Sequence, residues 1–451
     1  MEAITELTQT FIGQVILPGA PSYDEVRKIH NGMIDKRPAV IARCRGIADI
    51  ADAVRFARAK GLEIAVRGGG HNVGGRAVVD GALMIDLSLM KGVHVNPKDR
   101  TAVAEGGVIW KEFNRETQLH GLATTGGVIG TTGVAGLTLG GGLGWLMPKF
   151  GLALDNLLAV NLVLADGSLV RASAEDHPDL FWALRGGGGN FGVAASFEFR
   201  LHNVGPMVIG GLVAFPFSEA GKVLRAYRDL AATAPDELML VCALTTAPDG
   251  SGTKIVGVAA CHCGAREQGL AIADKIKTFG TVAMDAMGPI PYTALNGMLD
   301  AAFPAGAFNY WKSAFLPRID DTLIETAVAA YGRCPVPTSS LLLENFHGAG
   351  SRIPVDATAY ALRDSGFNAL IAGQWLDPPQ QAATMAWVRD TYQALQSAAG
   401  PRRYLNYLGF DEETETAAVA AYGANLSRLK TIKRQYDPEN VFHHNLNILP
   451  A

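Results

Sequence analysis

The sequence predicts an α+β protein of two domains, one of which contains a large antiparallel sheet with helices on one face. Three observations lead to this prediction. The chain has 451 residues, more than a single hydrophobic core usually holds. Glycine is concentrated between residues 61 and 195, where short strands and helices alternate. After Gly205 the sequence pattern changes, and longer strand-like runs alternate with amphipathic helices.

The first part of the chain begins with a predicted β-α-β unit. A strand over 38–44 is followed by a helix over 47–61, which ends at Gly61, and by a strand over 63–70. The next predicted elements are strands over 81–90 and 94–107, a helix over 108–121, a hairpin over 157–176 that turns at Asp166-Gly167, and a helix, glycine loop and strand over 179–205.

The second part, residues 206–400, predicts the antiparallel sheet and its helices. Residues 401–451 then return to helix and loop. The strands predicted in the second part cover 210–219, 237–246, 254–263 and 339–348, and the helices cover 218–234, 266–280, 321–332 and 380–398.

Composition and charge exclude several classes of partner. The net charge is −4 and no basic stripe is present, which argues against nucleic acid as a partner. No run of about 18 apolar residues occurs, so we expect no membrane span. The N-terminal segment starts acidic and lacks the apolar run of a signal peptide, so we expect a cytoplasmic protein.

The cysteines predict neither disulfides nor a metal site. Five cysteines are an odd and sparse set, unlike a disulfide framework. Cys261-His262-Cys263 lacks the C-x2-C spacing of a zinc site, and no second pair follows. We interpret this tripeptide as part of a buried strand and expect no metal.

Three glycine-rich segments suggest a long ligand that carries a pyrophosphate. They are "VRGGGHNVGG" (66–75), "TTGGVIGTTGVAGLTLGGGLGWL" (124–146) and "RGGGGNFGV" (185–193). Glycines reach positive φ freely and let backbone N–H groups converge on an anion or a flat ring. No G-x-G-x-x-G lies between a strand and a helix with an acid about 20 residues further on, and no phosphate-loop motif occurs, so neither common nucleotide fold is indicated.

Four segments together resemble one family. The loop "VRGGGHN", the run "GLTLGGGLGWLMPKFGLALDN", the segment "DLFWALRGGGGNFGV" and the tail "YDPENVFHHNLNI" are similar to the berberine-bridge-enzyme-like FAD-linked oxidases of the vanillyl-alcohol-oxidase fold. The resemblance is collinear from about Gln14 to Pro450. It implies a two-domain PCMH-type FAD-binding fold, with an FAD-binding domain over 1–205 completed by 406–451, and a substrate-binding domain over 206–405.

The resemblance also implies a covalent bond from His71 to the 8α-methyl group of the flavin. A neutral imidazole is a nucleophile, and the glycines beside it let the ring edge approach. Some relatives carry a second, cysteinyl link, but the corresponding residue here is Ile129, so we predict a single link and no cysteinyl link. Doubly linked relatives often have a histidine at the place of Leu137. Thr132 stands at the position thought to govern oxygen access, and its size, similar to valine, is compatible with an oxidase.

The cofactor-contacting residues follow from the same segments. The tail is expected to return to the flavin. Asp155 and Asn156, which follow the second glycine-rich segment, match the pattern of relatives. The residues implied are Arg67, Gly68, Gly69, Gly70, His71, Asn72, Gly127, Thr131, Thr132, Gly133, Gly136, Gly141, Gly142, Asp155, Asn156, Val193 and Asn445.

A tyrosine pair is the main catalytic candidate. Removing a hydride from an alcohol or amine carbon also requires loss of the O–H or N–H proton. In "RRYLNYLGF", Tyr404 and Tyr407 match the Y-x-N-Y pattern of many carbohydrate and secondary-alcohol oxidases of this group. A phenol has a pKa near 10 and needs a nearby cation to act as a base, and Arg402 and Arg403 are adjacent in sequence. The alternative is that both tyrosines only pack between the domains, and the sequence does not say which of them is the base.

Glu344 is the third catalytic candidate. It lies in the strongly apolar segment "LLLENFHG", where an uncompensated carboxylate would be costly, so burial would indicate a purpose. The alternative is an edge-strand glutamate that faces water. In "FNYWKSAF", Tyr310 and Trp311 are candidate walls for a ring-containing substrate, or simply core residues.

We therefore expect a covalent FAD oxidase that removes a hydride from a C–OH or C–N centre of a small cyclic substrate, such as a sugar, secondary alcohol, lactol or alkaloid-like molecule, and reduces O2 to H2O2. One alternative is a dehydrogenase that uses another electron acceptor. A second is a non-redox flavoprotein cyclase, and a pure binding module is the least supported. We expect a monomer or a homodimer.

Overall fold

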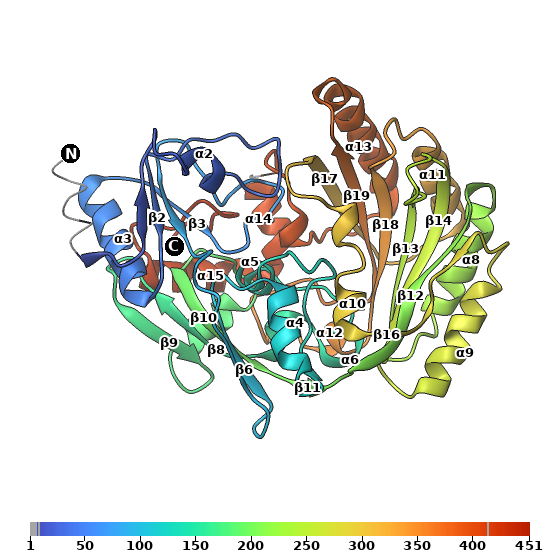
Figure 1. The fold of residues 1–451 in the computed structure, drawn as a ribbon, viewed down its shortest axis with the longest axis horizontal. Coiled ribbons are helices and arrows are strands. Elements are labelled where there is room, and N and C mark those ends of the chain that lie inside the picture. The colour runs from blue at the N-terminus through green and yellow to red at the C-terminus, as the bar shows by residue number, and fades with distance from the viewer. Residues whose placement is uncertain (1–6, 8–9, 413–414) are drawn as a thin grey trace.

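The computed structural model describes residues 7, 10–412 and 415–451. Figure 1 shows two halves side by side, one with the blue and green elements and one with the yellow and orange elements. The red C-terminal helices α14 (Glu415–Tyr422) and α15 (Leu426–Tyr436) lie back among the elements of the first half. There α15 packs against α7 (Pro178–Leu184). The end of the chain is therefore a structural part of the first half.

A four-stranded sheet opens the first half. Its order is β1 (Gln14–Ile16), β2 (Val40–Arg43), β4 (Leu83–Asp86) and β3 (Ile64–Arg67). Helix α3 (Ile47–Lys60) connects β2 and β3 and ends at Gly61, whose φ of 65° is accessible to glycine without strain. The predicted β-α-β unit is confirmed, and β4 pairs in parallel with both of its strands, between them.

An antiparallel five-stranded sheet follows, in the order β5 (Val93–Asn96), β6 (Thr101–Glu105), β10 (Val193–Arg200), β8 (Leu157–Val163) and β9 (Leu169–Ser173). The predicted hairpin of β8 and β9 is confirmed, and Ser168 N–H donates to Asp166 Oδ1 across its turn at 2.8 Å. The single strand predicted over 94–107 is wrong. Residues 97–100 form a turn closed by Asn96 and Asp99, and they divide the segment into β5 and β6.

Short elements complete the first half. They are α2 (Tyr23–Val26), α4 (Trp110–Gln118), α5 (Val134–Leu139), α6 (Met147–Phe150) and the pair β7 (Leu122–Ala123) and β11 (His202–Asn203).

The second half is built on an eight-stranded antiparallel sheet, the third sheet. The sequence predicts four of its strands but not the short β15 (Met284–Asp285) and β16 (Gly288–Pro291) or the longer β17 (Phe308–Leu316) and β19 (Gly366–Trp375). Every residue of β19 is buried, so its sequence has no alternation from which a strand could be inferred. The path of the sheet is β15 (Met284–Asp285), β12 (Met207–Pro216), β14 (Lys254–His262), β13 (Leu238–Thr246), β18 (Ser340–Phe346), β19 and β17, with β16 (Gly288–Pro291) paired to β12.

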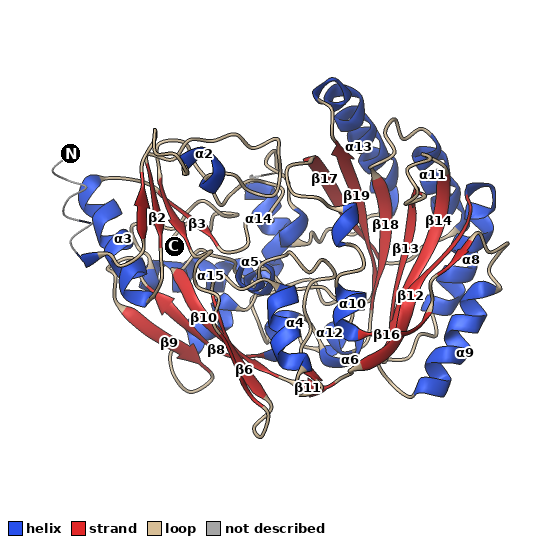
Figure 2. Cartoon of the chain, in the orientation of Figure 1, coloured by secondary structure: helices blue, strands red, loops and turns tan. Residues whose placement is uncertain are grey.

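Helices cover one face of the third sheet and leave the other face directed toward the first half. Figure 2 shows the four longer helices on the outer side of the sheet. They are α8 (Ala220–Ala231), α9 (Arg266–Lys277), α11 (Asp321–Gly332) and α13 (Gln381–Leu395), and the remaining helices are α10 (Tyr292–Asn296) and α12 (Ala349–Arg352). Tyr227, Trp375 and Trp387 lie in the core between sheet and helices. The inner face is thereby free to line a site.

No helix in the described part of the chain is long and apolar enough to cross a bilayer. Cys261 lies on β14, as the interpretation of the Cys-His-Cys tripeptide as a strand requires, and all five cysteines are free.

Candidate functional site

A cavity of about 840 Å³ lies between the glycine-rich segments of the first half and the inner face of the third sheet. Successive side chains of a strand point to opposite faces, so each central strand contributes every second residue. Strand β18 contributes Ser340, Leu342 and Glu344 to the wall. Strand β13 contributes Val241, Ala243 and Thr245 in this alternation, and Thr246 at its end.

Most of the predicted site residues meet at this cavity. All three glycine-rich segments reach it, the third through Gly188, Gly189 and Gly192. The predicted residues that line it are Gly68, Gly69, Gly70, His71, Asn72, Gly127, Thr132, Gly133, Gly136, Glu344, Tyr404, Tyr407 and Asn445.

Arg67 is a predicted cofactor residue that the structure places elsewhere. Its guanidinium pairs with both oxygens of the buried Asp86 and donates to the carbonyls of Val26 and Lys28. Through these bonds the Arg67 side chain joins β3 and β4 to the end of α2 and the residues that follow it. Thr131 also lies behind the wall of the cavity, but its Oγ1 is 3.4 Å from His71 Nε2.

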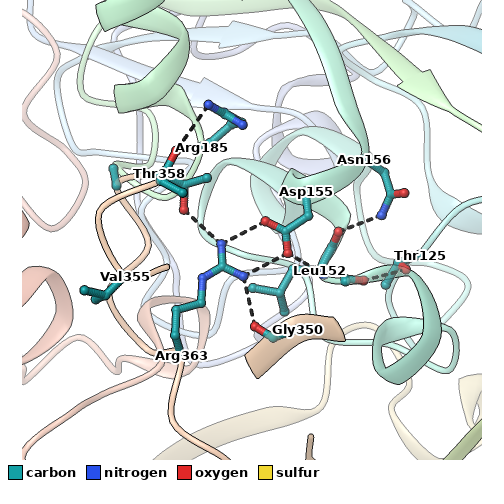
Figure 3. A network of polar contacts seen from close by, with 12 residues as sticks. Thr125, Leu152, Asp155, Asn156, Arg185, Gly350, Val355, Thr358 and Arg363 are labelled. Atoms are coloured by element: carbon teal, nitrogen blue, oxygen red, sulfur yellow. Dashed lines mark hydrogen bonds and ion pairs between the residues drawn. The ribbon is translucent and has the colours of Figure 1, made fainter. Parts of the chain in front are cut away.

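Asp155 and Asn156 are likewise structural. Asp155 accepts two hydrogen bonds of 2.8 Å from Arg363 and one of 2.8 Å from Leu152 N–H, as Figure 3 shows. Asn156 Nδ2 donates to the carbonyls of Phe150 and Leu152. Asp155 thus holds the chain that follows the second glycine-rich segment against the second half of the molecule, whereas Asn156 stabilises the turn before it.

Gly141, Gly142 and Val193 also lie outside the lining. A Cβ on Gly141 would come within 2.8 Å of the Tyr360 ring and 3.0 Å of the Tyr404 ring. Its φ of 135° is one that residues with side chains rarely adopt. This glycine is therefore needed for close packing behind the tyrosines. Val193 is fully buried in the core beside β8.

Replacing Arg363 is expected to destabilise the protein strongly. Arg363→Met leaves the Asp155 carboxylate buried without its ion pair, and both side chains are only 5% exposed. We expect the apparent free energy of unfolding to fall by about 3–5 kcal/mol, measured by urea denaturation. The control is Arg352→Met, because Arg352 pairs with Asp236 at the surface and such pairs contribute about 1 kcal/mol or less. Equal decreases in the free energy of unfolding of the two variants would contradict the importance of the buried Arg363–Asp155 ion pair.

The His71 loop brings a neutral imidazole to the cavity. The ring stacks on His30 with centroids 3.8 Å apart and planes 20° apart. Burial, and secondly the neighbouring His30, lowers the pKa of His71 to about 3, so the imidazole is neutral at pH 7. A Cβ on Gly69 would lie 2.5 Å from the Cα of Gly133, so the first two glycine-rich segments touch through their backbones. The glycines therefore allow two segments of the backbone to approach closely beside the histidine.

The cavity fits a flavin dinucleotide. Gly136 lines it, and a Cβ built there would meet nothing within 4 Å, so the lack of a side chain leaves open space. His71 offers the nucleophile that a covalent flavin needs. In the described part of the chain no cysteine lines the cavity, and Ile129 is part of the wall. The residues present therefore suit FAD with an attachment through histidine.

Tyr404 has its oxygen surrounded by donors. It accepts hydrogen bonds from Gly142 N–H at 3.2 Å, Leu143 N–H at 3.1 Å and Asn406 Nδ2 at 3.0 Å. Asn406 Nδ2 also donates to the carbonyl of Leu137, which fixes the amide. Burial raises the pKa of Tyr404 to about 12, although these three bonds act in the opposite direction. Its ring is thus held in one place by the second glycine-rich segment.

Tyr407 is connected to a carboxyl group. Its hydroxyl donates to Glu344 Oε1 at 3.0 Å, and Asn368 Nδ2 donates to Glu344 Oε2 at 2.6 Å. Burial raises the pKa of Glu344 to about 7. Burial, and then the charge of Glu344, raises the pKa of Tyr407 well above its usual value. Because Glu344 is 6% exposed on a strand between β13 and β19, the alternative of an edge-strand glutamate is wrong.

Of the other aromatic and basic candidates, Trp311 lies at the cavity, whereas Tyr310 and Arg403 do not. Trp311 lines the cavity and meets the Tyr407 ring edge to face, with centroids 5.9 Å apart. Tyr310 points to the opposite face of β17, where its hydroxyl donates to Asp411. The guanidinium of Arg403 lies over the ring of Tyr392, away from the tyrosine pair. Sequence reasoning missed Asn368, because β19 was not predicted, and left Asn406 without a role although it stands inside Y-x-N-Y.

The sheet side of the cavity is mostly apolar, and the cavity opens to solvent. Leu212, Leu342 and Leu370 form much of this wall. Of the described residues that the third sheet contributes to the lining, Glu344 alone has an acidic or basic side chain. Exposed residues that also line the cavity mark where it reaches solvent, and they include Pro248, Ala301, Pro304, Pro337 and Leu376. Glu344 and Tyr407 therefore lie at the inner end of an apolar passage.

Two family models match the chain. Residues 38–173 match the model described as "FAD binding domain", and residues 403–449 match the model described as "Berberine and berberine like". The first match covers the His71 loop and the second glycine-rich segment. The second covers the tyrosine pair and the tail.

Relatives and solved structures are similar over nearly the whole chain. An FAD-linked oxidoreductase of Dictyostelium discoideum is 30% identical, with 100% of this chain and 97% of that protein covered. The (R)-6-hydroxynicotine oxidase of Paenarthrobacter nicotinovorans is 30% identical, with 97% of each chain covered. The crystal structure of 6-hydroxy-D-nicotine oxidase from Arthrobacter nicotinovorans superposes with a TM-score of 0.89 at 30% identity, over 98% of each chain. These matches confirm the resemblance and the PCMH-type fold that it implied.

Proposed function

We propose a function from the premise that this chain belongs to the berberine-like family of FAD-linked oxidoreductases. The protein is an FAD-dependent oxidoreductase. The finer proposal is an oxidase whose FAD is attached through His71 alone. It would remove a hydride from a C–OH or C–N centre of a small ring-containing substrate and reduce O2 to H2O2. The observation that carries the proposal is the hydrogen bond from Tyr407 to Glu344 at the inner end of the cavity.

Three features support a single histidyl attachment. His71 is neutral at pH 7 because its pKa is lowered to about 3 by burial, so its lone pair is available as a nucleophile. The His30 ring holds it in place by stacking. Some relatives bind the flavin through a cysteine at a second position. Here that position is occupied by Ile129, which forms part of the cavity wall and has no nucleophilic atom.

The Tyr407–Glu344 pair is suited to take the substrate proton. Bound FAD supplies a two-electron acceptor for the hydride. The substrate O–H or N–H proton would pass to the Tyr407 oxygen while the Tyr407 proton passes to Glu344 Oε1 along their 3.0 Å hydrogen bond. A carboxylate whose pKa is about 7 can accept a proton at neutral pH, whereas the phenol alone has a pKa well above 10. We assign Tyr404 a positioning role, because three donors already hold its oxygen.

The lining supports a neutral or cationic substrate with an apolar body. Leu342, Leu370 and Trp311 would face its ring, and the carboxyl of Glu344 would repel an anion beside it. The similarity to a 6-hydroxynicotine oxidase supports a C–N centre, whereas the Y-x-N-Y pattern supports a C–OH centre.

Anaerobic reduction of the flavin tests the proposal. A panel of secondary alcohols, lactols, sugars and cyclic amines is mixed with the enzyme without oxygen, and the flavin absorbance is followed. Bleaching by at least one class is expected, and its absence across the panel would favour the non-redox cyclase. Oxygen consumption and H2O2 formation are then measured with the active substrate. Bleaching without oxygen consumption would show a dehydrogenase instead.

The rate of flavin reduction is expected to increase with pH through about 7. Only the ionised form of Glu344 can accept the Tyr407 proton, and because burial raises the pKa of this carboxyl to about 7, protonation below that pH removes the acceptor. Glu344→Gln should slow reduction and abolish this pH dependence. Glu325→Gln, an exposed substitution on α11, is the control. A pH profile that keeps its inflection in Glu344→Gln would assign the titration to another group.

A further inference from the structure

A cluster of three potential metal ligands lies beside the cavity and has no part in the function proposed above. It consists of Glu63, His443 and His444, and one ligand atom of each lies within 4.8 Å of the others. Glu63 immediately precedes β3, whereas the two histidines belong to the tail that follows α15. His444 also lines the cavity.

The carboxylate of Glu63 faces both imidazoles. His444 Nε2 is 3.0 Å from Oε2, and His443 Nε2 is 3.7 Å from Oε1. In a tetrahedral zinc site with bonds of about 2.0–2.1 Å, neighbouring ligand atoms are separated by about 3.3 Å. The observed separations lie on either side of that value. One ion could therefore bind to all three side chains after small rotations.

The second nitrogen of His443 is arranged as in a metal-binding histidine. Its Nδ1 lies 2.8 Å from the carbonyl oxygen of Asn440, so the ring donates its Nδ1–H there and turns Nε2 toward Glu63. Metal-bound histidines typically make this kind of bond, which fixes the tautomer and the ring orientation.

We propose that Glu63, His443 and His444 bind one divalent transition-metal ion. Two imidazoles and one carboxylate suit Zn²⁺, with water in the fourth position. The ion would join the start of β3 to the tail. Both of these segments contribute to the cavity, through Ile64 and Val66 on one side and Phe442 and Asn445 on the other. Metal binding would therefore stabilise the closure of the first half by its C-terminal segment.

Zinc titration of the FAD-loaded, metal-free full chain tests the site. Calorimetry with ZnCl2 should give one ion per chain, and saturation should raise the Tm by a few degrees, because the ion binds the folded state preferentially. Co²⁺ should give visible d–d bands to the red of the flavin absorption. Glu63→Gln and His444→Ala should each weaken zinc binding at least about 100-fold, since each removes a direct ligand.

Other exposed histidines provide the controls. His94→Ala and His120→Ala change exposed side chains on other elements and should leave affinity and stoichiometry unchanged. The proposal is overturned if wild-type protein shows no saturable zinc binding, or if Glu63→Gln and His444→Ala bind zinc as the wild type does. Neither result depends on whether the flavin is covalently attached or on the substrate.

Discussion

His71→Ala is expected to yield protein that releases all of its flavin on denaturation, whereas denatured wild-type protein keeps its flavin. The variant removes the nucleophile at the first glycine-rich segment, and Ile129 offers no second attachment at the other side of the cavity. The glycine-rich segments and the cavity remain, so the variant should still bind FAD without a covalent bond. Acid precipitation followed by absorbance of pellet and supernatant measures the two fractions.

His30→Ala is the matched control for this experiment. It removes the ring that stacks on His71 at 3.8 Å but leaves the His71 imidazole. We expect its flavin to stay in the pellet, with slower attachment during maturation because His71 is held less firmly. Retention of flavin in denatured His71→Ala protein would show that another residue is attached.

Tyr407→Phe is expected to slow anaerobic flavin reduction by about 10²–10⁴-fold, the usual contribution of a general base. The phenylalanine ring keeps the edge-to-face contact with Trp311 but has no oxygen to pass the proton to Glu344. The content of attached flavin should not change, because the attachment depends on His71. Stopped-flow absorbance at saturating substrate gives the rate.

Tyr360→Phe controls for the loss of a buried hydroxyl near the site. Tyr360 packs edge to face against Tyr404, and among the described residues its hydroxyl has no hydrogen-bond partner. Its removal should change the reduction rate little. If Tyr407→Phe reduces flavin as fast as the wild type while Tyr404→Phe does not, the base is Tyr404.

The fold was predictable where local pattern decides the structure. Helix α3 has a regular apolar face and a glycine stop, and the β8–β9 hairpin has an Asp-Gly turn, so both follow from short-range signals. Strand β19 is buried along its whole length, so its apolar run lacks the alternation that marks a half-exposed strand. Its neighbour β17 is likewise buried along nearly its whole length, so its aromatic run lacks this alternation too.

The sequence predicts individual residues of the site but not which of them are hydrogen-bonded to one another. The glycine-rich segments and the Y-x-N-Y motif identify one part of the cavity lining, whereas most of the lining on the third sheet follows only from the fold. The hydrogen bond between Tyr407 and Glu344 joins residues 63 positions apart, and its existence depends on the order of strands in the third sheet. Glu63 and His444 are 381 positions apart, so no local motif indicates the proposed metal site.

Some predicted contact residues stabilise the protein instead. Arg67 lies within the first glycine-rich segment and Asp155 follows the second, but each forms an ion pair that joins separate elements. A charged side chain next to a ligand loop can point toward the ligand or away from it, and only the strand register and the packing decide which.

Peptide mass mapping of the denatured wild-type enzyme tests the central claim most directly. After proteolysis, the peptide that contains His71 should carry the additional mass of the flavin, fragmentation should place it on the imidazole, and no other peptide should be modified. An unmodified His71 peptide accompanied by free FAD, or a flavin found on a different residue, would contradict the account.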